Sequence, residues 1–165
     1  MKILLPIDES KASDKAVQFV GNVLSCRADD EFSLTLLHVV ESIRDSMATR
    51  GSGVEERSTN QQVHQDEEKR NRASGQQLLE RQRQTLVQAG LPVSAIDIKL
   101  LVKECLPEAK KVIAALAIIE EMQGGDYSVI ALGRRGSSAA QGQFLGSVAE
   151  KVLRESNGRT VWVID

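Results

Sequence analysis

The residues with the clearest chemical potential are glycines gathered in the last third of the chain. Six of the twelve glycines fall between Gly124 and Gly146. Glycine has no Cβ and accepts positive φ, so its backbone N–H can approach an anion closely. Gly146 is followed by Ser147 and by apolar residues at helical spacing, and the first N–H groups of a helix lack intrahelical partners and lie at the positive end of its dipole. The stretch from Gly133 to Ser147 therefore predicts a phosphate site, and the alternative is a loop whose glycines only make turns.

The spacing of these glycines differs from two common phosphate-binding motifs, because the chain contains neither GxxxxGK[ST] nor a Rossmann GxGxxG here. Instead, Gly133-x2-Gly136-x9-Gly146-Ser147 resembles the nucleotide-binding signature of the universal stress protein family, G-x2-G-x9-G-[ST]. Other family landmarks follow in order: KILLPID at residues 2–8, LHV closing a second strand at 37–39, and TVWVI at 160–164. The resemblance covers nearly the whole chain except about residues 42–75.

This resemblance implies a site for an adenine nucleotide, ATP or else ADP or AMP, with Mg²⁺. The nucleoside side would include apolar contacts, and the glycines and helix amides would hold the phosphates. The Asp8 carboxylate would bind ribose hydroxyls or approach a phosphate-bound magnesium, and its alternative role is to cap the helix after the first strand. The residues that the resemblance places in the site are Pro6, Ile7, Asp8, Val39, Leu132, Gly133, Gly136, Gly146, Ser147 and Val148.

Arg134 and Arg135 are the only cations between Gly133 and Ser147. We add Arg135 to the predicted nucleotide site because one of the pair could neutralise phosphate charge. The alternative is that both arginines are solvated on a surface loop. The pair departs from the smaller or His-containing pairs that are common in the family. Cys105 also departs from it, since many members have Gly two residues before Pro107, and we interpret it as a buried structural thiol.

Apolar runs and helical periodicity alternate along the chain. Strands are expected at 2–8 (ending at Pro6), 32–40, 96–102, 127–132 and 160–164. Four helices are expected between them. The first begins after Ser10 or Ser13, the second begins at about Gln61, the third has Pro107 in its first turn, and the fourth begins with the capping box Ser147–Glu150. The alternation predicts an α/β fold: an open five-stranded parallel sheet with helices on both faces, Rossmann-like and similar to adenine nucleotide alpha hydrolases. We expect the strand order 3-2-1-4-5, which the resemblance also implies, and a ligand at the switch point between strands 1 and 4.

Residues 41–77 are rich in Arg, Glu, Gln, Ser and Asn and contain few aliphatic residues. Such a segment buries little, so its first half is expected to be a surface loop and its second half a helix that ends at Gly90. We interpret the chain as one domain, 1–165, with a polar loop and helix extension at about 42–75. The extension is either a solvated helix or a partner-binding element. His38 is interpreted as a structural residue at the end of a strand.

Composition argues against binding to nucleic acid or to a membrane surface. The net charge of −2 gives no electrostatic footprint for nucleic acid or membrane, and 3% aromatic residues leave few stacking platforms for single strands. The chain opens with Met-Lys and a strand, without a signal peptide or a transmembrane run, and its two cysteines make no disulfide framework. We therefore expect a cytoplasmic protein. The resemblance implies a homodimer formed through strand 160–164.

The sequence contains no nucleophile–base pair, no HExxH and no paired carboxylates beside the glycines. It is interpreted as an ATP-binding universal stress protein with a regulatory role and without dedicated catalytic machinery, although slow ATP hydrolysis stays open. The alternative is an interaction module of the same fold that acts through residues 42–75. A nucleotidylyl transferase is disfavoured because no HxGH or SGGxDS follows the first strand.

Overall fold

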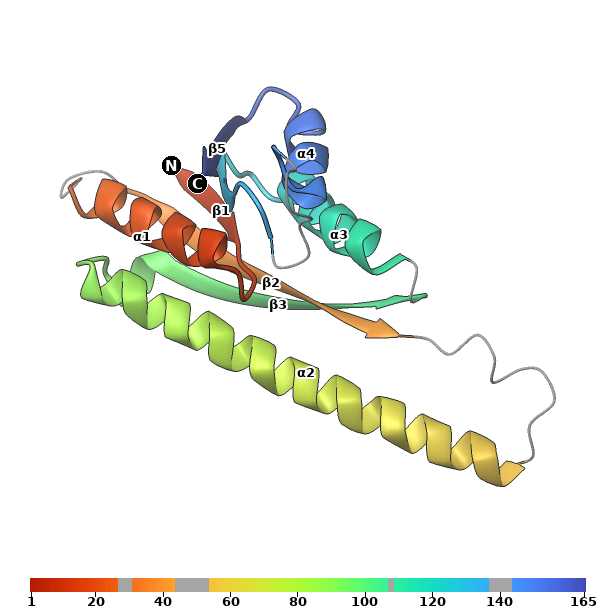
Figure 1. The fold of residues 1–165 in the computed structure, drawn as a ribbon. Helices are drawn as coiled ribbons and strands as arrows, with labels where there is room; N and C mark the ends of the chain where they lie inside the picture. Colours follow the sequence, from red (N-terminus) through yellow and green to blue (C-terminus); the bar gives the residue numbers. More distant parts are fainter. Residues whose placement is uncertain (27–30, 44–53, 107–108, 137–143) are drawn as a thin grey trace.

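The computed structural model describes residues 1–26, 31–43, 54–106, 109–136 and 144–165. They form one all-parallel sheet of five strands in the order β3-β2-β1-β4-β5, which confirms the predicted fold class and strand order (Figure 1). The elements, in chain order, are β1 (Lys2–Pro6), α1 (Lys11–Ser25), β2 (Ser33–Ile43), α2 (Val54–Gln88), the 3₁₀ turn η2 (Val93–Ala95), β3 (Ile96–Cys105), α3 (Lys110–Gly124), β4 (Val129–Gly133), α4 (Ser147–Arg154) and β5 (Thr160–Ile164).

Helices α1 and α2 cover one face of the sheet, and α3 and α4 cover the other (Figure 1). Successive residues of β1 divide between the two layers, since Ile3 and Leu5 pack with α1 and α2 whereas Leu4 packs with α3 and α4. All three are fully buried. A central strand that is covered on both faces must be apolar at every position, which is why β1 forms a continuous hydrophobic run.

Strand β2 is longer than the predicted 32–40. It pairs with β1 only as far as Pro6↔Leu37, but with β3 as far as Ile43↔Cys105. The LHV segment therefore does not close β2, and the prediction that His38 lies at a strand end is wrong. Pairing with β3 continues the strand through polar residues that the sequence pattern did not mark. The β2–β3 ladder overhangs the end of β1.

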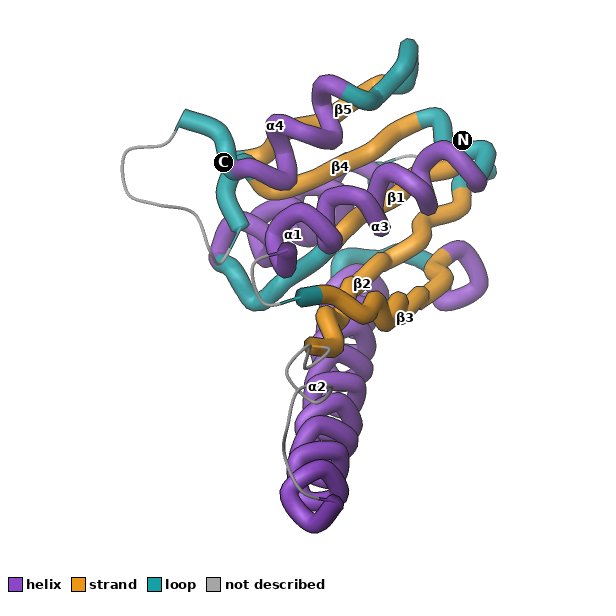
Figure 2. The backbone as a smooth tube through the Cα atoms, turned by 90° about the vertical axis from the view of Figure 1, so that its right-hand side faces the viewer, coloured by secondary structure: helices purple, strands orange, loops and turns teal. Residues whose placement is uncertain are grey.

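Helix α2 is also longer than predicted, because it begins at Val54 and not near Gln61. Its first part extends beyond the sheet in both views (Figures 1 and 2). Glu, Gln and Arg are good helix formers, so they can continue the helix where no apolar face is required. Residues 44–53, where the predicted surface loop falls, lie outside the described residues, as does Pro107, which was expected in the first turn of α3.

Three further local features concern the start of α1, the position of β3 and the cysteines. Ser10 caps α1, since its side chain accepts a hydrogen bond from the Ser13 N–H, and β3 is an edge strand as expected. Cys26 and Cys105 form no disulfide, and Cys105 is buried. Of the described helices, none has the length and apolarity that crossing a membrane requires.

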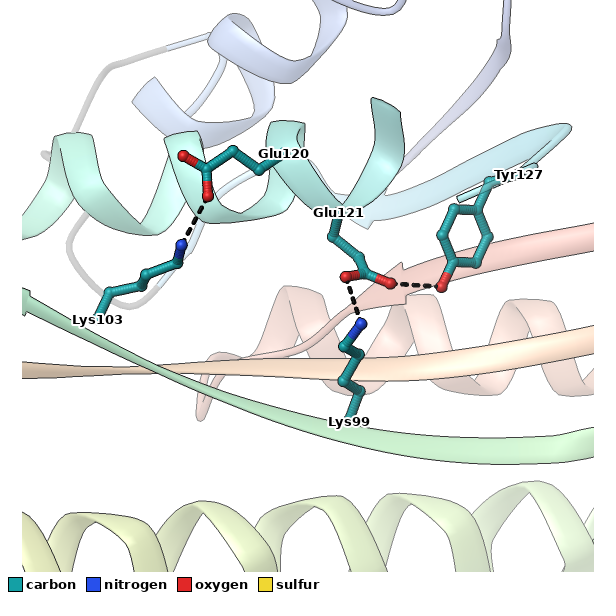
Figure 3. Close-up of polar contacts among 5 residues, drawn as sticks. All are labelled: Lys99, Lys103, Glu120, Glu121 and Tyr127. Carbon is teal, nitrogen blue, oxygen red and sulfur yellow. Dashed lines mark hydrogen bonds and ion pairs between the residues drawn. The ribbon is translucent and has the colours of Figure 1, made fainter. Parts of the chain in front are cut away.

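An ion pair between the exposed Lys99 and the largely covered Glu121 joins α3 to the edge of the sheet (Figure 3). Glu121 accepts hydrogen bonds from the Lys99 ammonium at 2.6 Å and from the Tyr127 hydroxyl at 2.8 Å. Burial is the largest single influence and by itself raises the pKa of Glu121, but the hydrogen bonds from Lys99 and Tyr127 and the nearby lysine charges outweigh it and hold the pKa below 4.5. The charged carboxylate therefore stabilises the folded protein above pH 4.5, and this stabilisation is lost as the pH falls through the folded-state pKa.

Glu121→Gln is expected to lower the free energy of unfolding by about 1–2 kcal/mol at neutral pH, because a charged hydrogen-bond acceptor is lost. The difference from the wild type should shrink as the pH falls below 4.5 and the wild-type carboxylate takes up its proton. Urea unfolding at neutral pH and at a series of acidic pH values measures it. Glu120→Gln is the matched control: Glu120 also lies 2.6 Å from a lysine, Lys103, but both side chains are exposed, so its loss should cost little. Equal effects of the two variants would contradict the prediction.

Candidate functional site

A pocket of about 590 Å³ lies at the carboxyl ends of β1 and β4, the predicted switch point of the sheet. The structure brings every residue predicted for the nucleotide site to the wall of this pocket. They are Pro6, Ile7, Asp8, Val39, Leu132, Gly133, Arg135, Gly136, Gly146, Ser147 and Val148. Residues that are distant in sequence are therefore neighbours around one cavity.

Of the two glycine properties named from the sequence, the signature positions use the missing Cβ and not the positive φ. Positive φ among the described glycines occurs at Gly90 and Gly158, and not at the glycines of the signature. What the signature positions need is the absence of Cβ. A Cβ at Gly133 would lie 2.7 Å from the carbonyl carbon of Ala12 in α1, and one at Gly136 would lie 2.8 Å from Asp8 Oδ2. At Gly146 it would lie 3.3 Å from the Arg134 carbonyl oxygen.

The amino terminus of α4 opens onto the pocket. Gly146 is the N-cap residue, and no side chain caps this helix, so the predicted capping box of Ser147 and Glu150 is wrong. The Gly146 N–H is already used, because it donates to the Arg134 carbonyl at 2.9 Å. The next N–H groups, of Ser147, Val148 and Ala149, belong to the first helical turn, which has no intrahelical acceptors, and all three residues line the pocket. Together they form a concave positive end suited to an anion.

Asp8 lies between the turn that caps α1 and the glycine loop. Its Oδ1 accepts hydrogen bonds from the Ser10 N–H at 3.1 Å and from the Ser10 hydroxyl at 2.5 Å, so it orders the turn that caps α1. The Asp8 N–H in turn donates to the Ser13 hydroxyl at 3.1 Å. Oδ2 is the oxygen that lies next to Gly136, in the wall of the pocket. One oxygen thus fixes the carboxylate in place and the other lies beside the glycine loop.

The two arginines have different surroundings. Arg135 lines the pocket, whereas Arg134 pairs with Asp165, with Nη2 3.0 Å from Oδ2, and lies over the Phe144 ring at 5.6 Å. Arg135 Nη2 is 3.7 Å from Asp165 Oδ1. Of the two arginines, Arg135 is the one that lines the pocket. The interpretation of both as merely solvated is wrong for Arg134, and sequence reasoning missed Asp165 because nothing in the pattern marks it.

Sequence reasoning also missed a second wall of the pocket, formed by the β2 overhang and α2. His38 and Glu41 come from β2, and Asn71, Ser74 and Gly75 come from α2. His38 has the structural contact that was expected, since its Nδ1 lies 2.8 Å from the Ile7 carbonyl oxygen. Gly75 was the available signal, because a glycine inside a helix costs about 1 kcal/mol relative to alanine and usually has a packing reason.

Comparisons with known proteins agree with this architecture. The model of the Universal stress protein family matches residues 1–104 and 107–164. The structure of UspA from Lactobacillus plantarum is similar, with 19% identity and a TM-score of 0.69 over 100% of this chain and 97% of that one. Hypothetical protein MJ0577 has the same identity and TM-score over 99% and 94% of the two chains. A universal stress protein in complex with cAMP is 18% identical, with a TM-score of 0.53 over 99% and 95%. Curated protein sequences gave no match.

Proposed function

The chain belongs to the universal stress protein family, and on this premise we propose that it is a regulatory protein that binds ATP, or else ADP or AMP, with Mg²⁺. The observation that carries the proposal is the convergence of the signature glycines, the first turn of α4 and Asp8 around one pocket. We further propose that it acts in the cytoplasm as a single domain over residues 1–165, and that it forms a homodimer through β5, whose one partner in the sheet is β4 within the described residues.

The pocket suits a nucleotide in size and lining. Its volume of about 590 Å³ lies within the roughly 300–1,000 Å³ of typical small-molecule sites. Phosphates would lie against Gly136, Gly146 and the free N–H groups of α4, with Arg135 neutralising charge. Val39 and Leu132 would supply apolar contact to the nucleoside. The universal stress protein that was solved with cAMP shows that this fold can hold a nucleotide, which supports the proposal.

Magnesium would enter with the phosphates. The described residues include no cluster of three or more His, Cys, Asp or Glu side chains that could hold a metal ion alone. Mg²⁺ prefers oxygen ligands and is usually held by one or two carboxylates together with substrate phosphates. Asp8 Oδ2 is the carboxylate oxygen beside the glycine loop, so it would take this role. The ion would neutralise phosphate charge in the pocket.

We propose binding, and not a committed reaction, as the function of the pocket. Among its described residues, no serine is hydrogen-bonded to a histidine, and the carboxylate that the Ser10 hydroxyl contacts, that of Asp8, belongs to the turn that caps α1. The hydroxyls of Ser10 and Ser13 take part in the cap of α1, and His38 Nδ1 is engaged with Ile7. Slow hydrolysis of bound ATP stays open, with no residue assigned as its base.

MgATP is expected to stabilise the protein against heat. At about a hundredfold excess over the Kd, binding to the native state alone adds about 2.7 kcal/mol of stability. For a chain of this size that corresponds to a rise in Tm of about 5–10 °C. Thermal unfolding with MgATP, ADP and AMP measures it, and acid extraction of the purified protein identifies any nucleotide that is already bound. If none of the three changes the Tm at millimolar concentration, the proposal is wrong.

The second candidate is an interaction module that acts through residues 42–75. The observation in its favour is the first part of α2, which extends beyond the sheet (Figures 1 and 2). This function requires no nucleotide. The thermal unfolding experiment therefore separates the two candidates, because a pure interaction module has the same Tm with and without MgATP.

A further inference from the structure

An acidic residue, Asp165, lies beside the glycine loop at the carboxyl edge of the sheet. Strands β4 and β5 are parallel and pair as far as Gly133↔Ile164. The residues that follow them, Arg134 and Arg135 after β4 and Asp165 after β5, therefore meet at this edge. The Arg134 N–H also donates to the Ile164 carbonyl oxygen at 2.6 Å, which holds the two segments against each other. The fold thus brings a carboxylate next to an arginine that lines the pocket.

The Asp165 carboxylate is shared between the two arginines. Oδ2 lies 3.0 Å from Arg134 Nη2, whereas Oδ1 lies 3.7 Å from Arg135 Nη2. Arg134 is the fixed partner, because its Nε is buried and its guanidinium lies over the Phe144 ring. Arg135 makes the longer contact, and 40% of its side chain is exposed. Arg135 is therefore the partner that Asp165 can lose without disturbing the packing.

The main chain of Arg135 lies against the amino terminus of α4. A Cβ at Gly146, the N-cap residue of this helix, would lie 3.3 Å from Arg135 Cα. The phosphates are proposed to bind at Gly136, Gly146 and the first turn of α4. The long arginine side chain can change rotamer while its backbone stays in place. Arg135 can therefore exchange the Asp165 carboxylate for a phosphate oxygen.

We propose that Asp165 competes with the bound nucleotide for Arg135 and thereby lowers the affinity of the pocket for phosphates. This inference rests on the proposed function. A carboxylate and a phosphate are both anionic acceptors for the guanidinium, and each forms charge-assisted hydrogen bonds with it. Binding therefore replaces one ion pair by another, and the lost pair offsets part of the gain. Exposed ion pairs are weak, so the offset corresponds to about two- to fivefold in the Kd.

The first test removes the negative charge of Asp165 and measures the binding of MgATP by calorimetric titration at physiological salt. Asp165→Asn is expected to bind MgATP about threefold more tightly than the wild type. The direction of the change is informative, because a purely structural role of Asp165 predicts equal or weaker binding after the substitution. Asp165→Glu retains the charge and should show no gain.

A double variant tests whether the effect acts through Arg135. Arg135→Gln should bind MgATP about tenfold more weakly, because a charged hydrogen-bond donor is lost. Adding Asp165→Asn to Arg135→Gln should then change the Kd by less than about 1.5-fold, since the two residues no longer interact. Asp126→Asn is the matched control for net charge. Asp126 is exposed and precedes β4 at the opposite edge of the sheet, so its loss should leave the Kd unchanged.

The outcomes separate this inference from the proposed function. Competition is overturned by unchanged or weaker binding in Asp165→Asn, by wild-type affinity in Arg135→Gln, or by an equal gain from Asp165→Asn with and without the Arg135 side chain. Each of these results leaves nucleotide binding intact. If the wild type does not bind MgATP, the proposed function falls and this inference falls with it. The amide oxygen of Asp165→Asn can still accept from Arg134, and thermal unfolding without nucleotide confirms that each variant is folded.

Discussion

Replacing Gly136 by leucine is expected to lower the affinity for MgATP by about 100-fold or more, equivalent to about 2.7 kcal/mol of binding free energy. A Cβ at this position would lie 2.8 Å from Asp8 Oδ2, and both residues line the pocket. Asp8 cannot simply move away, because Ser10 holds its Oδ1 with two hydrogen bonds. The leucine side chain would therefore occupy the space between the carboxylate and the glycine loop, where the phosphates are proposed to bind.

The folded protein should tolerate this change. Gly136 is exposed, its φ is not positive, and its Cβ would meet no backbone atom of a described residue within 4 Å, so the clash stays local to the Asp8 carboxylate. Gly124→Leu is the matched control, because a Cβ at Gly124 has no other atom within 4 Å. Calorimetric titration with MgATP and thermal unfolding without nucleotide should be run on both variants. Wild-type affinity in Gly136→Leu would show that the glycine loop is not the phosphate site.

The fold was predictable because its signals are local and repeated. The apolar run of β1 indicates burial on both faces, and helical segments between successive strands require parallel crossovers. The family signature then located the pocket, since Gly133, Gly146 and Asp8 follow or precede elements that meet at the switch point. These inferences depend on residue type and order, and neither requires knowledge of how one helix lies on the sheet.

The second wall of the pocket was not predictable, because it depends on how α2 lies on the sheet. Glu41 and Ser42 interrupt the apolar pattern of β2, and their strand conformation comes from pairing with Lys103 and Glu104 of β3. Ser42 also donates to Glu68 of α2 at 2.7 Å, a contact between segments that are distant in the sequence. The position of α2 over His38 depends on such tertiary contacts, which periodicity does not encode.

The predicted capping box of α4 was wrong by one residue. The motif S-V-A-E places its serine at the N-cap, but α4 begins one residue earlier, with Gly146 as N-cap and Ser147 as the first helical residue. Helix boundaries are the least certain part of a pattern-based assignment. The shift has a consequence for the site, because the Ser147 hydroxyl is not used for capping and stays exposed at the pocket.

Gly133→Ala is expected to destabilise the protein by about 2–3 kcal/mol, the cost of overpacking a tight contact, and to lower its Tm by about 5–10 °C. The new Cβ would lie 2.7 Å from the carbonyl carbon and 2.8 Å from the carbonyl oxygen of Ala12. This obstacle is the backbone of α1 and not a side chain, so α1 must shift away from β4. Thermal unfolding without nucleotide measures the effect, and Gly124→Ala provides a control in open space.

A double variant tests whether the backbone is the obstacle. Ala12 Cβ also lies close, at 2.9 Å from the added Cβ, so a clash between side chains alone would be relieved by Ala12→Gly. We expect no rescue, because the Ala12 carbonyl group stays in place. Recovery of stability in Ala12→Gly/Gly133→Ala, relative to Ala12→Gly alone, would contradict this explanation. An unchanged Tm in the single variant would do the same. If the prediction holds, Gly133 and Gly136 belong to one signature but have separate tasks: the first lets α1 pack on the sheet, and the second keeps the pocket open for the ligand.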